Sequence, residues 1–270
     1  MIASWGQIES YAYWGTFTVA FLGVSVWETV RPRGTLSAPA GLRWRNHGLL
    51  LVAASLFSMV LLRSTPVLVA LAVQRGKYRL AALDHLPRLA GWVFTILLLD
   101  LVKYATHRLF HTVGFLWRVH QVHHSDPDFD VSTGARAHPL ETVVTQGAAL
   151  LAILAFRLPP AAVLAAELMA CAQSCFQHAN ASLPAPLETA LRPWLVTPDW
   201  HRIHHSMDEA DQQHNLGELF PWWDRLFGTY AARAGVGDDQ FPTGLKGLKD
   251  AGSLKLTFML TTPFKTPVKL

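Results

Sequence analysis

The chain has 270 residues, of which 51% are hydrophobic and only 16% charged, with a formal net charge of +4. At a mean hydropathy of +0.22 it is too apolar for an ordinary soluble domain or a disordered chain. No basic face interleaved with aromatic residues stands out, so nucleic-acid binding is excluded. The two cysteines, Cys171 and Cys175, lie four residues apart, which excludes a disulfide framework and a four-cysteine zinc site.

The first predicted membrane span is residues 11–28, an apolar run that is followed by Arg31 and Arg33. The two arginines put this end of the span inside the cell. No basic residue precedes the run and no clear small-residue cleavage site follows it. We therefore expect a retained helix rather than a signal peptide.

Two further runs, 48–73 and 90–106, are long enough to span a bilayer. Arg63 and Pro66 interrupt the first of them, and the basic loop 74–89 would then lie outside, against the positive-inside tendency. This conflict counts against the bounds 48–73 of the second span. The run 90–106 acquires charged residues toward its end, as a helix does when it leaves the lipid and continues into water.

The last apolar runs, 140–157 and 161–177, are separated by Leu158-Pro159-Pro160, which suits a tight turn between two helices or a hairpin that dips into the membrane. The sequence therefore predicts an all-α polytopic membrane protein with about four or five transmembrane or hairpin helices. The remaining polar segments are expected to form a cytoplasmic helical cap rich in histidine: 29–47, 107–139 and 178–270.

Eight of the thirteen histidines fall into three groups with spacings of three and four residues: His107 and His111; His120, His123 and His124; and His201, His204 and His205. Such spacings repeat on one face of a helix, so each group can offer two or three imidazoles to one metal region. The second and third groups are near copies, HQVHHSDPD and HRIHHSMDE. Eight imidazoles are too many for one metal ion and suit two.

Isolated histidines are more often surface or core residues, and we assign no metal to His47, His85 or His214. Cys171, Cys175 and His178 share a helical face and offer a soft metal site, but the two cysteines fit better as small packing residues. Imidazole binds zinc, copper, nickel and iron alike, so the ligands alone do not name the metal. A closed structural zinc site would not call for so many histidines.

Oxygen chemistry at two irons needs many neutral ligands, open positions for O2 and a route for an apolar substrate from the lipid, and the sequence offers all three. A membrane metal transporter or sensor is the competing class, but it should place its ligands near mid-membrane. A haem-carrying electron-transfer protein is a third class, with histidines paired across helices within the membrane.

Seven motifs follow one another between about Leu97 and Tyr230: HRLFH, WRVHQVHHS, AHPLE, FQHAN, WHRIHHS, HNLG and WWDRLFGTY. In this order they resemble the fatty acid hydroxylase/sterol desaturase superfamily of integral-membrane enzymes, and the sterol-desaturase-like members somewhat more than the acyl 2-hydroxylases. The first ninety residues carry no motif beyond their hydropathy.

The resemblance implies two non-haem irons, O2 as co-substrate and an external electron donor of the ferredoxin, rubredoxin or cytochrome type. It implies metal-ligand roles for nine residues: His107, His111, His120, His123, His124, His178, His201, His204 and His205. Fatty acid 2-hydroxylases carry a further histidine where this chain reads Ala179-Asn180-Ala181-Ser182. His138 either is a tenth metal ligand or, as we favour, contacts the ligands without binding the metal itself.

Charged residues beside the motifs are expected to support the ligands. Asp126, Asp128, Asp199 and Asp208 flank the histidine groups and are candidates to accept imidazole N–H groups. In WWDRLFGTY, Asp224 and Arg225 are expected to pair across a turn.

We expect three regions: an N-terminal transmembrane region, 1–89; a catalytic domain, 90–235; and a basic tail, 236–270. The predicted function is hydroxylation or desaturation of a C–H bond in a lipid, such as a sterol-like or fatty acyl compound that enters from the bilayer. The alternative is a histidine-rich membrane protein that binds or transports metal without oxygenase activity.

Overall fold

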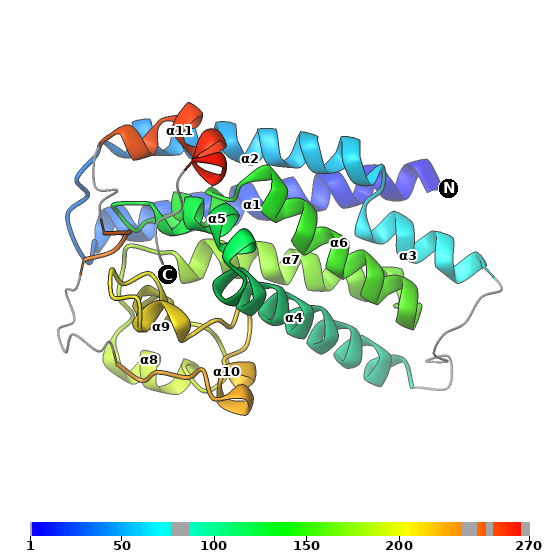
Figure 1. The fold of residues 1–270 in the computed structure, drawn as a ribbon. Coiled ribbons are helices and arrows are strands. Elements are labelled where there is room, and N and C mark those ends of the chain that lie inside the picture. Colours follow the sequence, from blue (N-terminus) through cyan, green and yellow to red (C-terminus); the bar gives the residue numbers. More distant parts are fainter. Residues whose placement is uncertain (1, 77–86, 234–241, 247–250, 266–270) are drawn as a thin grey trace.

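The chain folds into a bundle of long helices, with most of the shorter helices gathered at one end and α3 at the other (Figure 1). The computed structural model describes residues 2–76, 87–233, 242–246 and 251–265, and within these ranges it holds no β-strand. The long helices are α1 (Ile2–Val30), α2 (Ala40–Leu62), α4 (Arg88–Thr112), α6 (Pro139–Phe156) and α7 (Pro160–Gln177). The shorter α-helices are α3 (Pro66–Arg75), α5 (Gly114–His124), α8 (Ala185–Leu191), α9 (Pro198–His204), α10 (Trp222–Phe227) and α11 (Leu256–Thr261).

The long helices pack side by side through an apolar core. Helix α1 packs on α7, α2 on α6, and α4 on both α6 and α7. Leu99, Ile153 and Val163 meet in this core, and Val67 of α3 joins them. Leu158-Pro159 separates α6 from α7 because Pro160 cannot continue the preceding helix, as the sequence predicted.

Among the described residues, three helical segments are long and apolar enough to cross a membrane: Ala40–Arg75, Arg88–Thr112 and Pro139–Phe156. They contain the predicted spans 48–73 and 90–106 and nearly all of 140–157. Helices α1 and α7, which carry the predicted spans 11–28 and 161–177, lie in the same bundle but are not among these three segments. The all-α membrane architecture predicted from the sequence is confirmed.

The predicted span 48–73 is not one continuous helix. Arg63 adopts a left-handed conformation at φ 54° and ends α2, and Pro66 begins α3 after Thr65 has capped it. The interruption noted at Arg63 and Pro66 is therefore a true break. Most of the basic loop 74–89, with His85, lies outside the described residues.

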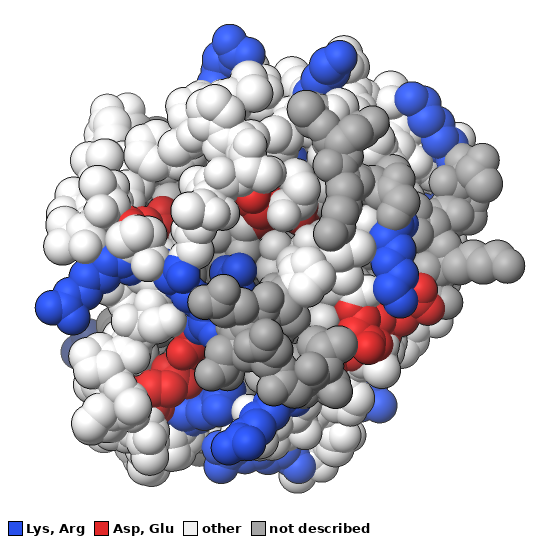
Figure 2. Space-filling view, turned by 90° about the vertical axis from the view of Figure 1, so that its left-hand side faces the viewer, with Lys and Arg blue, Asp and Glu red and all other residues white. Residues whose placement is uncertain are grey.

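The polar end of the bundle holds the loops between the long helices and the shorter helices, and Figure 2 looks onto it. Helix α4 does not stop where its apolar run stops but continues to Thr112 and carries His107 and His111 into this end. Asp100 of the same helix accepts hydrogen bonds from the backbone N–H groups of Leu219 and Phe220. These hydrogen bonds attach the loop that contains Leu219 and Phe220 to α4.

A buried ionic network joins the first turn of α2 to the loop that follows α5. The Arg43 side chain is 0% exposed, and its guanidinium donates to Asp126 at 2.9 Å and to Asp130 at 3.0 Å and 3.1 Å. Asp128 lies 3.4 Å from the same group. Although burial raises the pKa of Asp126, Arg43 holds it well below its usual range.

Replacing Arg43 with methionine should destabilise the fold strongly, because three buried carboxylates would lose their cation. We expect the free energy of unfolding to fall by about 3–5 kcal/mol, measured by thermal or chemical unfolding in detergent. Arg45 of the same helix is exposed, so Arg45→Met removes an equal charge and should change stability little. Equal losses in the two variants would contradict the structural role of the network.

Candidate metal centre

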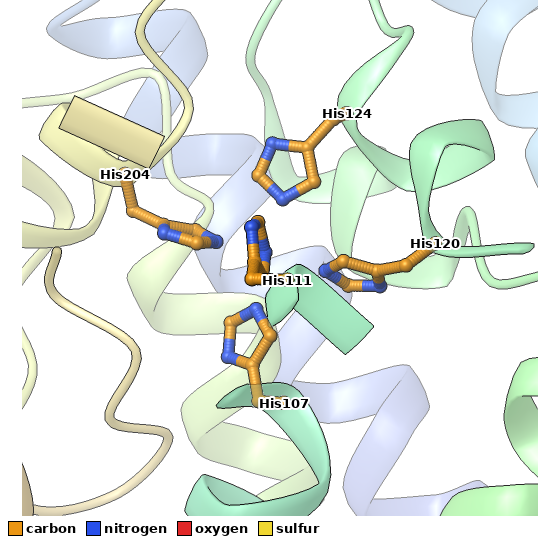
Figure 3. Close-up of side chains that lie close together, drawn as sticks. All are labelled: His107, His111, His120, His124 and His204. Carbon is orange, nitrogen blue, oxygen red and sulfur yellow. The ribbon is translucent and has the colours of Figure 1, made fainter. Parts of the chain in front are cut away.

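Five histidine rings converge at the polar end of α4 (Figure 3). Each offers a ring nitrogen within 4.8 Å of the others, and all five residues are buried. The members of this group, which we call the five-histidine group, are His107 and His111 of α4, His120 and His124 of α5, and His204 of α9.

A second group lies beside the first and contains four buried histidines, again with ligand nitrogens within 4.8 Å of one another. This four-histidine group consists of His123 of α5, His178 at the end of α7, His201 of α9 and His205, which directly follows α9. The two groups are in contact, since the rings of His124 and His205 stack with their centroids 4.6 Å apart.

The two H-x-x-H-H motifs divide their histidines between the groups in opposite ways. In α5, His120 and His124 point to the five-histidine group, and His123 points to the other. In α9, His201 and His205 point to the four-histidine group and His204 to the other. Residues four apart share a helical face more closely than residues three apart, which explains the division. Each motif therefore contributes histidines to both groups, whereas the helical spacing alone predicted one metal region for each motif.

Main-chain carbonyls fix the orientation of several of these rings. The Nδ1 atom of His107 lies 2.8 Å from the carbonyl oxygen of Leu216, and Nδ1 of His204 lies 2.9 Å from that of His214. A carbonyl can only accept, so Nδ1 carries the proton and Nε2 keeps a lone pair directed into the group. The HNLG motif thus supplies two carbonyls through its backbone.

Two more rings are held in the same way. His120 donates its Nδ1 proton to Glu141 Oε1 at 2.9 Å, and His178 donates to the carbonyl of Ser174 at 2.8 Å. Gly134 allows the close packing around His178, because a Cβ at this position would lie 3.0 Å from His178 Nδ1 and 2.9 Å from Ser174 O.

The inward nitrogens have no ordinary hydrogen-bond donors. Buried Nε2 atoms of His107, His120 and His204 have no partner among the described residues, and both ring nitrogens of His111 and His124 are likewise unpartnered. In the four-histidine group, Nε2 of His178 lies 3.2 Å from Nε2 of His201 and 3.3 Å from that of His123. Lone pairs that face one another in a buried space are what a bound cation would satisfy.

Burial also keeps these rings neutral. Burial, together with neighbouring imidazoles, lowers the pKa of five histidines well below its usual range: His123, His124, His201, His204 and His205. A neutral imidazole is the form that binds a metal. The donor set, nine buried nitrogen ligands in two adjacent groups, therefore fits two metal ions.

The four aspartates expected to support the ligands do not contact them, and that expectation was wrong. Asp126 and Asp128 face Arg43, and Asp199 pairs with Arg33. Asp208 accepts from the N–H of Ala210. Proximity in sequence did not predict these contacts, because the chain turns away from the rings after each motif. The main-chain carbonyls that accept from the rings cannot be recognised from the side chains in the sequence.

Asp224 and Arg225 do not pair with each other, in contrast to the expectation. Asp224 accepts from the backbone N–H groups of Leu216 and Gly217, and so holds the loop that carries the Leu216 carbonyl. Arg225 lies over the ring of Tyr230. Burial raises the pKa of Asp224 to about 6.

Other residues singled out from the sequence lie outside both groups. The Nδ1 atom of His138 accepts from the N–H of Leu140 and caps α6, and the Nε2 atom faces the carbonyl of Leu260 at 3.4 Å. His47 bonds Ser132 and Arg136. Cys171 and Cys175 are buried and belong to neither group.

Comparisons with known proteins point to one family. The model of the family described as fatty acid hydroxylase matches residues 92–229, just over half of the chain. The chain is 29% identical over 143 residues to an alkylglycerol monooxygenase of Caenorhabditis elegans, which covers 52% of this chain and 27% of the relative. It is 30% identical over 150 residues to an ornithine lipid hydroxylase of Rhizobium tropici, covering 54% and 44%.

A methylsterol monooxygenase of Gallus gallus is 28% identical over 131 residues, covering 48% of this chain and 42% of the relative. The aligned parts thus span less than half the length of these three relatives. No solved structure matches the chain.

Removing the Glu141 carboxylate should loosen the five-histidine group, because His120 would lose the acceptor that orients its ring. We expect Glu141→Ala to weaken metal binding by about 10–100-fold, measured by titrating a divalent metal ion into the metal-free protein. Glu141→Gln keeps an acceptor oxygen and should recover part of the affinity. The exposed Glu209 offers a control, and a Glu209→Ala loss as large as that of Glu141→Ala would contradict the assignment.

Proposed function

The chain belongs to the fatty acid hydroxylase family, and from this premise we propose that it is a membrane enzyme that hydroxylates a C–H bond of a lipid. The reaction consumes one O2, two external electrons and two protons, and it yields the hydroxylated lipid and one water. The observation that carries the proposal is the set of nine buried imidazoles, which converge with unpartnered nitrogens at the polar end of an apolar bundle.

We propose that the nine histidines hold two non-haem irons, one at each group. Bound iron supplies the O2 reduction and C–H cleavage that no protein side chain provides. The chain's own residues hold the inward Nε2 atoms in place, through the carbonyls of His214 and Leu216 and the Glu141 carboxylate. The buried surroundings keep bulk water away from the reacting carbon.

A cavity inside the bundle supports a substrate that enters from the lipid. It measures about 220 Å³ and is lined by residues of α4, α6 and α7, among them Leu99, Ile153 and Ala166. A smaller space of about 40 Å³ beside His107 and His120 is lined in part by the same residues, Lys103, Thr145 and Glu218. The shared lining supports a path from the bundle interior to the five-histidine group.

The substrate class follows from the surroundings of the site and from the relatives. The names of the relatives refer to alkylglycerol, ornithine lipid and methylsterol, which supports a lipid without choosing among sterol-like, fatty acyl and other lipids. We propose that 90–235 form the catalytic domain and that the histidine groups face the cytoplasm, where Arg31 and Arg33 favour that side. The electrons come from a separate donor of the ferredoxin, rubredoxin or cytochrome type.

His204→Ala should remove one ligand from the five-histidine group, and His123→Ala should remove one from the four-histidine group. We expect each variant to lose about one of two irons per chain and nearly all lipid oxidation, since the metal ligands act as a unit. Iron content by elemental analysis and product formation by mass spectrometry would be measured together. His138→Asn keeps the cap of α6 and should retain both. Full iron content in His204→Ala would contradict the ligand assignment.

The lipid product decides between the proposed reaction and its rivals. The purified protein, supplied with a membrane lipid extract, a reductant and isotopically heavy O2, should yield a lipid that has gained one labelled oxygen atom. Loss of two hydrogens without added oxygen would indicate desaturation instead. Haem absorbance, or metal flux across vesicles without O2 consumption, would reject the oxygenase in favour of an electron carrier or a transporter.

A further inference from the structure

A pocket of about 290 Å³ opens at the polar end of the molecule, away from the bundle cavity. Its walls come from the loop between α1 and α2, the loop after α5, and α9, and they include Thr35, Asp128, Phe129 and Arg202. Figure 2 looks onto this end and shows Lys and Arg side chains scattered over it, with fewer Asp and Glu side chains.

Arg202 lines this pocket, and two of its guanidinium nitrogens lack hydrogen-bond acceptors. These Nε and Nη1 atoms are buried and make no hydrogen bond within the part of the chain that the structure describes. The negative charge of Asp128 acts on Arg202, but that carboxylate makes its hydrogen bonds with Ser37, Ala38 and Arg43 instead. Arg33, a second arginine nearby, is paired with Asp199. Buried guanidinium N–H groups without acceptors are unfavourable, so an anionic group that reached them would be bound.

Phe129 connects the pocket with the metal region. Its ring lies 5.2 Å from the Arg202 guanidinium carbon. Its centroid lies 5.1 Å from that of His205 and 5.6 Å from that of His178. An anion held by Arg202 would therefore stand one aromatic ring away from the four-histidine group.

We propose that this pocket receives a carboxylate side chain of an acidic protein electron donor, which delivers electrons to the metal region past Phe129. The inference rests on the proposed function. Each docking oxidises a one-electron donor by one electron, and two dockings supply the two electrons of the reaction. The net charge of +4 favours an acidic partner, and complementary charge also accelerates its association.

Donor binding to the iron-loaded protein in nanodiscs tests the proposal. The probes are a plant-type ferredoxin, a rubredoxin and an acidic cytochrome b5 domain, each titrated at low and at physiological salt. At least one should bind. We expect Arg202→Met to weaken that affinity by about tenfold or more, since a buried charge pair would be lost. Arg31→Met removes the same charge from an exposed site outside the pocket and should change affinity by less than about twofold.

A second variant keeps the test valid if Arg202→Met misfolds, because residue 202 lies between the proposed ligands His201 and His204. Thr35 is exposed on the pocket wall, and Thr35→Glu places a competing carboxylate there while Arg202 stays in place. It should weaken donor binding by about fivefold or more at unchanged iron content.

Three results would overturn the docking site: no binding of any of the three donors to the unchanged protein, equal losses in Arg202→Met and Arg31→Met, or an unchanged affinity in Thr35→Glu. Phosphate or citrate binding that depends on Arg202, with donor affinity unaffected, would assign the pocket to a free anion and likewise reject the proposal. Lipid hydroxylation driven by dithionite needs no donor. Its failure in the unchanged protein would reject the proposed function separately.

Discussion

The arrangement of the polar end depends on one constraint, which is that nine buried imidazoles must direct lone pairs toward one another. In four of the rings the Nδ1 atom finds an acceptor, which directs the Nε2 lone pair into the groups. The carbonyls of Ser174, His214 and Leu216 and the carboxylate of Glu141 are these acceptors. The loop 214–219 is thus as much a part of the site as the helices that carry the rings.

The same loop links the site to the apolar bundle. Asp224 accepts from the N–H groups of Leu216 and Gly217, and Asp100, in the middle of α4, accepts from those of Leu219 and Phe220. On the other side, Arg43 ties the first turn of α2 to the loop that follows α5. Two sets of polar contacts therefore hold the loop around Leu216 and the loop after α5 against the long helices.

A separate space approaches each histidine group. The cavity inside the bundle approaches the five-histidine group through residues of α4 and α6, and its lining combines apolar side chains with the charged residues Asp100, Lys103, Glu167 and Glu218. The pocket at the polar end approaches the four-histidine group through Phe129 and carries an arginine with two unpartnered guanidinium nitrogens. In the proposed reaction, the lipid and the electron donor would therefore not compete for the same opening.

The sequence by itself determined the helical membrane architecture, the turn at Leu158-Pro159-Pro160 and eight of the nine histidines, because hydropathy, proline and helical spacing are local properties. His178 was named only through the resemblance to the family. Only the tertiary structure divided those histidines into groups of five and four, since the division depends on how α4, α5, α7 and α9 meet. It also decided which groups orient the rings. The flanking aspartates were expected in that role, but the backbone carbonyls of Ser174, His214 and Leu216 and the Glu141 carboxylate perform it. A backbone carbonyl is identical in every residue, so the sequence does not mark it.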